Sequence, residues 1–340
     1  MTGTLMAREM AEQPGVLARL VARFDADVAR VQAVIPAPLA GIVFLARGSS
    51  DHAAVYGRYL AEIAAGRPAG LAAPSLHTLY HARVDYSGYL VVALSQSGAT
   101  PEIVTVCERM RAAGGRVIAI TNEGGSPLTE AADDVLRLDA GTERAVPATK
   151  TMTAELLAVA AVASALGPVP FTRDELAALP GAVAAVLADD GPARRLAAHW
   201  ATVDRMFVAT RGLLYGVALE AALKIKETTG VLAEGYSAAD LRHGPVAAVE
   251  AGAPVLILDA GGAASADLRD LGTLARGRGA PVAVCAPRPE ADLPVPGEVP
   301  EALSAITITV QAQHVALALA RARGVDPDAP QGLSKVTRTQ

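Results

Sequence analysis

Two polar segments of the chain carry the side chains of an anion-binding site. Each follows a short apolar run and precedes an amphipathic stretch, and together they contain Ser49, Ser50, Ser95, Gln96, Ser97 and Thr100. Thr100-Pro101-Glu102 has the form of a helix N-cap with proline at the first helical position. Because a helix N-terminus offers free N–H groups and a positive dipole, and hydroxyls add donors, we expect a phosphate or carboxylate ligand. The ordinary alternative is that these residues only form turns and caps.

A second set of residues has the types and spacing of an acid–base group. Glu220, Lys224 and Glu227 fall at i, i+4 and i+7, on one face of a helix predicted over 213–229. Farther along, His243 precedes a Gly-Pro pair, a constrained turn that suits a positioned side chain. From spacing alone, a solvated charged helix face and a capping or core histidine are the commoner alternatives.

Short apolar runs separated by helix-like stretches must position these residues. The runs predicted as strands are 42–46, 90–94, 117–120, 135–138, 207–210, 255–258, 282–285 and 305–310. Continuous apolar strands that alternate with helices are typical of a parallel sheet covered on both faces. We therefore predict an α/β fold. Ligands of such sheets bind at the carboxyl ends of strands, which is where the polar segments begin.

The strands repeat at a constant spacing. An offset of 164 residues relates three pairs of segments, which are Arg47-Gly48 with Arg211-Gly212, 91–94 with 255–258, and 118–120 with 282–284. Three matches in register predict the duplication of one α/β unit. The hydroxyls occur in the first copy only, because Ser49-Ser50 correspond to Leu213-Leu214 and Ser95–Thr100 to Asp259–Ala264. This difference predicts one small-molecule site in the first copy and another task for the second.

Composition and charge exclude several classes of protein. The 340 residues suit two domains, and 51% of them are hydrophobic, 4% aromatic and 19% charged, with a net charge of −5. We expect no nucleic-acid partner, because long basic blocks are absent. The apolar run 156–167 is too short to cross a bilayer and suits a buried helix, and residues 1–13 lack an apolar signal core. We therefore expect no membrane partner and a cytoplasmic location. The sequence has neither a lysine-bearing phosphate loop nor a GxGxxG helix start, so a nucleotide is not favoured.

The cysteines and the remaining histidines are predicted to be structural. Cys107 and Cys285 lie in apolar contexts without a nearby cysteine, which predicts buried thiols. His77 and His81 have an i, i+4 spacing but no third ligand in view, so we expect no metal. His52, His199 and His314 are also interpreted as structural.

Six ordered motifs together resemble the sugar isomerase (SIS) double domain, the isomerase half of glucosamine-6-phosphate synthase. They are Met6–Pro14, Ser95–Gly98, Ala148–Lys150, Lys224–Glu227, Ala238–Pro245 and Leu333–Lys335. The resemblance implies two duplicated three-layer α/β/α SIS domains, each with a parallel flavodoxin-like sheet. It divides the chain into a helical arm (1–40), a first SIS domain (41–167), a helical linker (168–200), a second SIS domain (201–325) and a catalytic tail (326–340).

The resemblance also implies roles for particular residues. The sugar-phosphate clamp falls on the polar residues of the two segments, and further sugar contacts fall on Val146 and Ala148. The proton-transfer carboxylate corresponds to Glu227, with Lys224 near the substrate oxygens. His243 corresponds to a ring-opening acid–base group that a neighbouring subunit supplies, and Lys335 to a lysine that forms an imine with the open-chain ketone. Two positions depart from the pattern, because Ala148 replaces a serine and Asp240 replaces a glutamate.

The resemblance implies an enzyme of amino-sugar phosphates. The synthase carries a glutaminase domain with an N-terminal cysteine, whereas this sequence starts with Met1-Thr2. We therefore expect a deaminase that does not use glutamine and converts glucosamine 6-phosphate and water to fructose 6-phosphate and ammonia. Alternatives are a deglycase or isomerase of a related sugar phosphate, such as a fructose-amine 6-phosphate or galactosamine 6-phosphate, and a non-catalytic sugar-phosphate sensor. We expect a homodimer with a shared active site and no cofactor.

Overall fold

The chain folds into two compact units, each built around one sheet. The computed structural model describes residues 2–330, 332, 333 and 335. The first-sheet unit comprises residues 16–143 and 151–169, and the second-sheet unit comprises 2–15, 144–150 and the described residues from 170 to 335. The segment 1–40 is divided between the two units at residue 15, and the helices of the segment 168–200 lie in the second-sheet unit.

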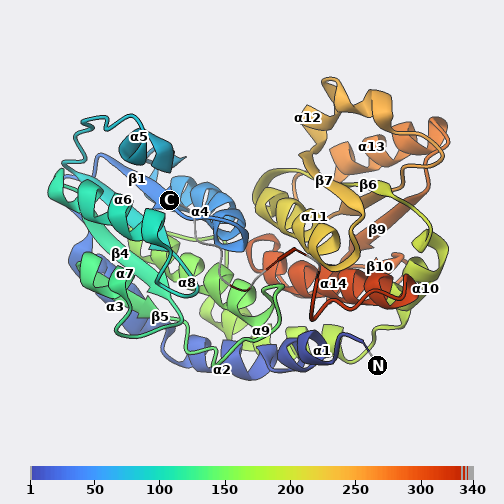
Figure 1. Ribbon diagram of the computed structural model, residues 1–340, viewed down its shortest axis with the longest axis horizontal. Helices are drawn as coiled ribbons and strands as arrows, with labels where there is room; N and C mark the ends of the chain where they lie inside the picture. The colour runs from blue at the N-terminus through green and yellow to red at the C-terminus, as the bar shows by residue number, and fades with distance from the viewer. Residues whose placement is uncertain (1, 331, 334, 336–340) are drawn as a thin grey trace. The chain divides into compact units, whose positions relative to one another are not determined.

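The first-sheet unit contains a five-stranded parallel sheet in the order β2-β1-β3-β4-β5. Strands β1, β4 and β5 of this sheet are labelled in Figure 1. Its strands are β1 (Gly41–Leu45), β2 (Ala69–Leu71), β3 (Tyr89–Leu94), β4 (Arg116–Thr121) and β5 (Asp134–Arg137). Its helices are α2 (Gln13–Ala22), α3 (Phe24–Val34), α4 (Ser49–Ala65), α5 (Pro74–Thr78), α6 (Pro101–Ala112), α7 (Pro127–Ala131) and α8 (Lys150–Leu166). This strand order is that of flavodoxin-like folds.

The second-sheet unit contains a parallel sheet in the order β10-β9-β8-β6-β7. Its strands are β6 (Arg205–Thr210), β7 (Leu232–Ser237), β8 (Val255–Leu258), β9 (Val282–Ala286) and β10 (Leu293–Pro294). Its helices are α1 (Thr4–Ala11), α9 (Arg173–Leu187), α10 (Gly191–Trp200), α11 (Tyr215–Thr229), α12 (Ala238–Arg242), α13 (Ser265–Gly277) and α14 (Glu301–Ala322), with 3-10 turns at Gly212–Leu214 and Pro245–Ala248. The two sheets have the same order when their strands are counted from the start of each copy, which confirms the duplication.

The strand register refines the spacing between the two copies. Val43 pairs with Val91 in the first sheet and Phe207 pairs with Val255 in the second, so the offset is 164 for these strands. In the next pair of strands, Val91 lies opposite Val117 but Val255 lies opposite Val282. The offset there is 165, and our match of 118–120 with 282–284 is wrong by one residue. Because strand side chains alternate between faces, the corrected register is the one that conserves the buried face.

One predicted strand is wrong. Residues 305–310 lie inside α14, and every residue of this Ala-Ile-Thr-Ile-Thr-Val run is buried. A β-branched run buried on all sides reads the same in a central helix as in a central strand, because no polar face reveals the period. The predictions also omitted β2, β7 and β10, whose sequences AGL, LAEGYS and LP are short or partly polar, as edge strands often are.

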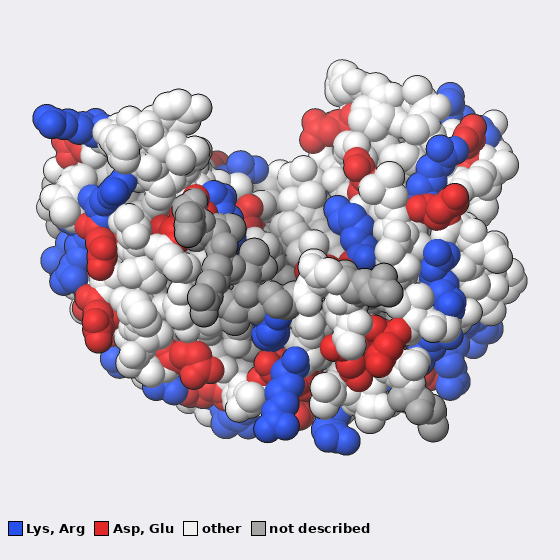
Figure 2. Space-filling model, in the orientation of Figure 1, with Lys and Arg blue, Asp and Glu red and all other residues white. Residues whose placement is uncertain are grey.

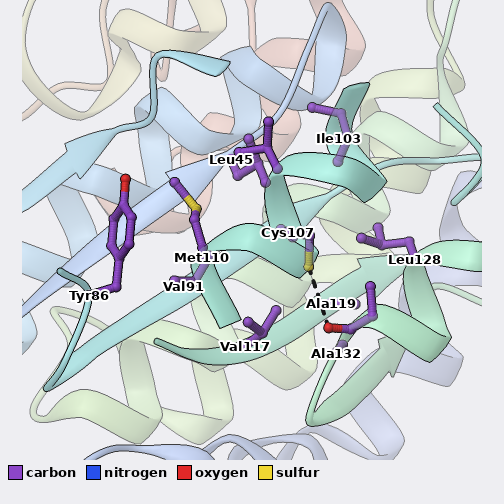
Figure 3. Packing of buried hydrophobic residues seen from close by; sticks show 13 residues of the cluster. Leu45, Tyr86, Val91, Ile103, Cys107, Met110, Val117, Ala119, Leu128 and Ala132 are labelled. Atoms are coloured by element: carbon purple, nitrogen blue, oxygen red, sulfur yellow. Dashed lines mark hydrogen bonds between the residues drawn. The ribbon is translucent and has the colours of Figure 1, made fainter. Parts of the chain in front are cut away.

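Both cysteines are buried, as predicted. Cys107 lies on α6 in the apolar cluster between α6, α7 and the sheet, and its thiol donates to the carbonyl of Ala131 at 3.7 Å (Figure 3). Burial raises the pKa of the Cys107 thiol to about 12 and also raises that of Cys285. Both side chains are therefore protonated core residues near neutral pH.

Among the described residues, one helix has the length and composition of a membrane span. It is α14, and 94% of its most apolar stretch is buried inside the protein. This burial is that of a core helix, because α14 packs against α9, α10 and α11 of the same unit. Acidic and basic side chains are interspersed over the face shown in Figure 2, in keeping with the near balance of charges.

Candidate active site

The two hydroxyl-bearing segments meet at the carboxyl edge of the first sheet. Strands β1 and β3 are parallel neighbours, so the segments that follow them emerge side by side. The guanidinium of Arg47 donates to both carboxylate oxygens of Glu102, at 2.9 and 3.1 Å, and so links the end of β1 to the first turn of α6. Glu102 is buried. The structure thus brings the predicted clamp residues to one edge.

The hydroxyl of Thr100 is not used to cap α6. Thr100 occupies the N-cap position with Pro101 next to it, as predicted, but its side chain forms no capping bond. Its Oγ1 instead lies 3.4 Å from Oγ of Ser95. Two hydroxyls therefore face each other at the start of a helix, where the dipole favours an anion. Ser97 Oγ accepts from the backbone N–H of Ala99 at 3.3 Å and keeps its own proton to donate.

Gly98 fixes the turn of this loop. Its φ is +59°, and a Cβ at this position would lie 2.0 Å from Oγ of Ser126. The backbone N–H of Gly98 donates to Ser95, and its carbonyl accepts from the N–H of Leu128 at 2.9 Å. Only glycine combines the left-handed backbone with this close approach. The backbone of Gln96 is held in turn, because its carbonyl accepts from the N–H of Asn122 at 3.1 Å.

Sequence reasoning missed the partner of Ser50. Ser49 and Ser50 begin α4, and the Ser50 hydroxyl donates to Oε1 of Glu155 at 2.8 Å. Glu155 lies on α8 and is 1% exposed. Because this bond uses the hydroxyl proton, Ser50 can offer a ligand only its lone pairs in this arrangement. The sequence feature that could have pointed to this bond is that Glu155 is the single carboxylate within the apolar stretch of α8.

The charged residues of α11 are buried. Lys224 Nζ donates to a carboxylate oxygen of Glu227 and lies 3.5 Å from Oε1 of Glu220. The side chains of Glu220 and Lys224 are 1% and 2% exposed, and that of Glu227 is 21% exposed. The solvated charged face that spacing alone favoured is therefore wrong, because α14 and β7 cover α11. Of the three, Glu227 is the group that solvent and ligands can reach.

His243 lies on an exposed turn that an ion-pair network holds. It follows α12, and Gly244 has a φ of +141°. The preceding residue, Arg242, donates to Asp267 at 2.6 Å, and Arg211 donates to the same carboxylate at 2.7 Å. Burial alone would raise the pKa of Asp267, but the two guanidinium groups outweigh it and lower this pKa. Sequence reasoning missed Asp267.

Two carboxylates anchor the segment that leads to Lys335. Asp328 accepts from the backbone N–H groups of Leu5 and Met6 at 2.8 and 2.9 Å, and Asp326 accepts from that of Gly3 at 3.1 Å. They satisfy the N-terminal N–H groups of α1 and tie the start of the tail to it. Lys335 is half-buried. Residues 331, 334 and 336–340 of the predicted tail lie outside the described residues.

The loop with Val146 and Ala148 is also fastened to the N-terminal helices. The carboxylate of Glu9 accepts from the N–H groups of Arg144 and Ala145, and Glu12 pairs with Lys150 at 2.6 Å. Val146 and Ala148 themselves are half-buried. This loop belongs to the second-sheet unit, as do Lys224, Glu227, His243 and Lys335, whereas the hydroxyl clamp belongs to the first-sheet unit.

His77 is held by a phenol. Its Nε2 lies 2.9 Å from the hydroxyl of Tyr86, and burial lowers its pKa, with the Arg109 charge adding to the effect. Across the described residues, no three His, Cys, Asp or Glu side chains are grouped to hold a metal ion.

Comparison with known proteins identifies the pattern of the two units. The family model described as SIS domain matches residues 40–165 and 201–322. The chain is 34% identical over 355 residues to glutamine–fructose-6-phosphate aminotransferase (isomerizing) of Aeropyrum pernix, which covers 98% of the chain and 57% of that protein. The chain is 33% identical to the protein of the same name from Streptomyces coelicolor, and the alignment covers 98% of this chain and 58% of that protein. The chain thus spans little more than half the length of these relatives.

Solved structures share the fold over nearly the whole chain. A candidate phosphosugar isomerase from Silicibacter pomeroyi has a TM-score of 0.86 and 34% identity, with 96% of this chain and 100% of that one covered. Glucosamine-6-phosphate deaminase from Thermotoga maritima has a TM-score of 0.81 and 23% identity, and the match covers 99% of this chain and 100% of that one. At 23% identity the second comparison speaks for the fold alone.

Proposed function

Because the chain belongs to the SIS domain family, we propose that it is a glucosamine-6-phosphate deaminase, which converts this sugar phosphate and water to fructose 6-phosphate and ammonia. The observation that carries the proposal is the pair of hydroxyl loops at the carboxyl edge of the first sheet, where Ser95 and Thr100 face each other at a helix start. A phosphate is the ligand that hydroxyl donors and a helix N-terminus favour.

Glu227 is proposed to move the proton between C2 and C1. After the ring opens, the substrate has an aldehyde at C1 and an amine at C2. One base takes the proton from C2 and returns it to C1, while the C1 oxygen gains a proton and the nitrogen loses one, which converts the amino aldehyde to a C2 imine with a hydroxyl at C1. A carboxylate that is partly exposed and bonded to a buried ammonium, as Glu227 is to Lys224, suits this repeated exchange. Lys224 also stabilises the charged carboxylate before the first transfer and after the second.

Lys335 is proposed to assist the release of ammonia. As the neutral amine, its Nζ adds to C2 of the imine, ammonia leaves, and the new imine joins Lys335 to the sugar. Water then adds to C2, the C2–Nζ bond breaks, and fructose 6-phosphate and free Lys335 result. These steps need acid–base groups and an amine, so we propose no cofactor. The bonds of Asp328 to α1 hold the start of the segment that precedes Lys335.

His243 is proposed to catalyse ring opening in the active site of a second copy. The support is its exposure on a braced turn, where it can reach a partner. Mixing Glu227→Gln with His243→Ala tests this. If the site is shared in a homodimer, random exchange restores about a quarter of wild-type activity, since one site of each mixed dimer has both wild-type residues. If the mixture stays inactive although mixed dimers form, His243 does not act across the interface.

The test of the function is direct. The purified protein is incubated with glucosamine 6-phosphate, and ammonia and fructose 6-phosphate are measured separately. Equal amounts of both support the proposal, and the absence of ammonia overturns it for this substrate. A panel with galactosamine 6-phosphate, a fructose-amine 6-phosphate and unaminated sugar phosphates identifies a deglycase or isomerase instead. Binding without turnover of any of them indicates a sensor.

A further inference from the structure

The second-sheet unit contains a cavity away from the residues discussed so far. It has a volume of about 500 Å³ and lies among α1, the turn between α9 and α10, α10 and α14. These helices pack together within one unit. Met10, Leu187 and Leu317 contribute much of its apolar wall, together with alanines. A volume of this size is that of a small-molecule site.

A buried histidine with one unpartnered ring nitrogen lines this cavity. His314 on α14 is 6% exposed, and its Nδ1 has no hydrogen-bond partner within the described part of the chain. Burial lowers its pKa, and the charges of Asp189 and Asp190 oppose this shift only in part. The ring is therefore neutral near pH 7 and offers one donor and one acceptor. Because an unsatisfied buried polar group is costly, its position on a cavity wall points to a ligand group.

The charged groups around the cavity favour an anion. Asp190 and Arg194 form an i, i+4 pair at 3.3 Å. Arg321 donates to the carbonyl oxygens of Thr2 and Gly3, which do not neutralise its charge. The lining thus has two guanidinium groups and one carboxylate. Asp189 lies outside the lining, and its Oδ1 accepts from the N–H of Gly191.

We propose that this cavity binds a small amphipathic molecule with one negative charge. The apolar body of the molecule contacts the alanine and leucine side chains of the wall, its anionic group lies near Arg321, and a polar group forms a hydrogen bond to His314. The site is independent of the proposed deaminase reaction, because it shares no residue with the hydroxyl clamp or with the acid–base residues.

Two probes with the same aromatic body test the proposal. 1-Anilinonaphthalene-8-sulfonate carries one sulfonate, and N-phenyl-1-naphthylamine is the same molecule without it. Fluorescence titration of the folded full chain is expected to show one saturable site for the sulfonate. In Arg321→Gln, we expect weaker binding of the sulfonate and unchanged binding of the neutral probe. Equal responses of the two probes to this substitution overturn the assigned anion preference.

Matched tryptophan variants locate the site. Ala198 is exposed on α10 and lines the cavity, whereas Ala185 is exposed on α9 and does not. Ala198→Trp is expected to weaken sulfonate binding at least tenfold, and Ala185→Trp to leave it unchanged. His314→Leu, which keeps most of the side-chain volume, is expected to weaken binding of both probes about three- to tenfold, the effect of one hydrogen bond.

The contrary result is equally clear. If Ala198→Trp and Ala185→Trp bind the sulfonate alike, or if His314→Leu binds both probes like the wild type, the cavity is not the site. If the wild type shows no saturable binding, the proposal is wrong. None of these readouts depends on turnover, so failure here and failure of the deaminase proposal are distinguishable.

Discussion

Replacing Lys224 by methionine is expected to destabilise the second-sheet unit strongly. The Lys224 ammonium lies between Glu220 and Glu227 on α11, and the side chains of Lys224 and Glu220 are 2% and 1% exposed. Methionine keeps the length and most of the apolar contacts of the lysine stem, so little cavity forms. What is lost is the ammonium next to a carboxylate that water cannot reach.

The size of the effect follows from this burial. Removing one partner of a buried ion pair costs about 3–5 kcal/mol, because the remaining charge stays desolvated. Removing one partner of an exposed helical pair costs less than about 1 kcal/mol. Asp190 and Arg194 form such a pair on α10, with side chains 40% and 68% exposed. Arg194→Met is therefore the matched control, and its free energy of unfolding should be close to that of the wild type.

The assay is urea unfolding followed by the fluorescence of Trp200, the single tryptophan of the chain, which is buried in the second-sheet unit. Adding Glu220→Gln to Lys224→Met removes both charges, and we expect it to recover about 2 kcal/mol of the loss. A loss below about 1 kcal/mol for Lys224→Met, equal to that of the control, would refute the claim that this helix face is buried.

Three further predictions concern other parts of the chain. Gly98→Ala should weaken sugar-phosphate binding and lower the melting temperature more than Gly125→Ala does. Both glycines have positive φ, but only at Gly98 would a Cβ collide with a neighbour. Equal effects of the two substitutions in calorimetry would contradict this. Cys107 should not react with a thiol reagent at pH 8 unless urea unfolds the chain, since its pKa is raised to about 12; rapid labelling of the folded protein at this thiol would show that it is accessible. The pKa of His314 is lowered from 6.5, so the unfolded chain takes up a proton before the folded chain does as the pH falls below 6.5, and the stability of the fold should fall with the pH. In thermal melts, the melting temperature of His314→Leu should fall less over this pH range than that of the wild type. The same pH dependence in both proteins would count against the assignment.

The sheets could be predicted from the sequence because their central strands are short continuous apolar runs. Strands β7 and β2 lie at or near an edge and lack such a run, so nothing local marks them. Residues 305–310 mislead for the opposite reason. Their burial on every side comes from helices elsewhere in the chain, and a run of six residues is too short to reveal a helical period.

The candidate site shows the same limit. The hydroxyl loops could be predicted because each follows directly on its strand, and strand ends are local signals. The burial of Glu220 and Lys224 could not, since α14, which covers them, begins some 80 residues later in the sequence. The bond from Ser50 to Glu155 spans 105 residues, and no spacing rule joins them. Spacing finds residues on one helix face, and tertiary packing decides what that face does.

We propose that this chain binds a sugar phosphate through its hydroxyl loops and moves a proton with Glu227. The measurement that tests it most directly is ammonia release from glucosamine 6-phosphate by the wild type and by Glu227→Gln, with the affinity for the sugar phosphate measured by calorimetry on the same samples. We expect the wild type to release ammonia, and Glu227→Gln to bind the sugar phosphate with similar affinity but release none. Ammonia release by Glu227→Gln at the wild-type rate would contradict it.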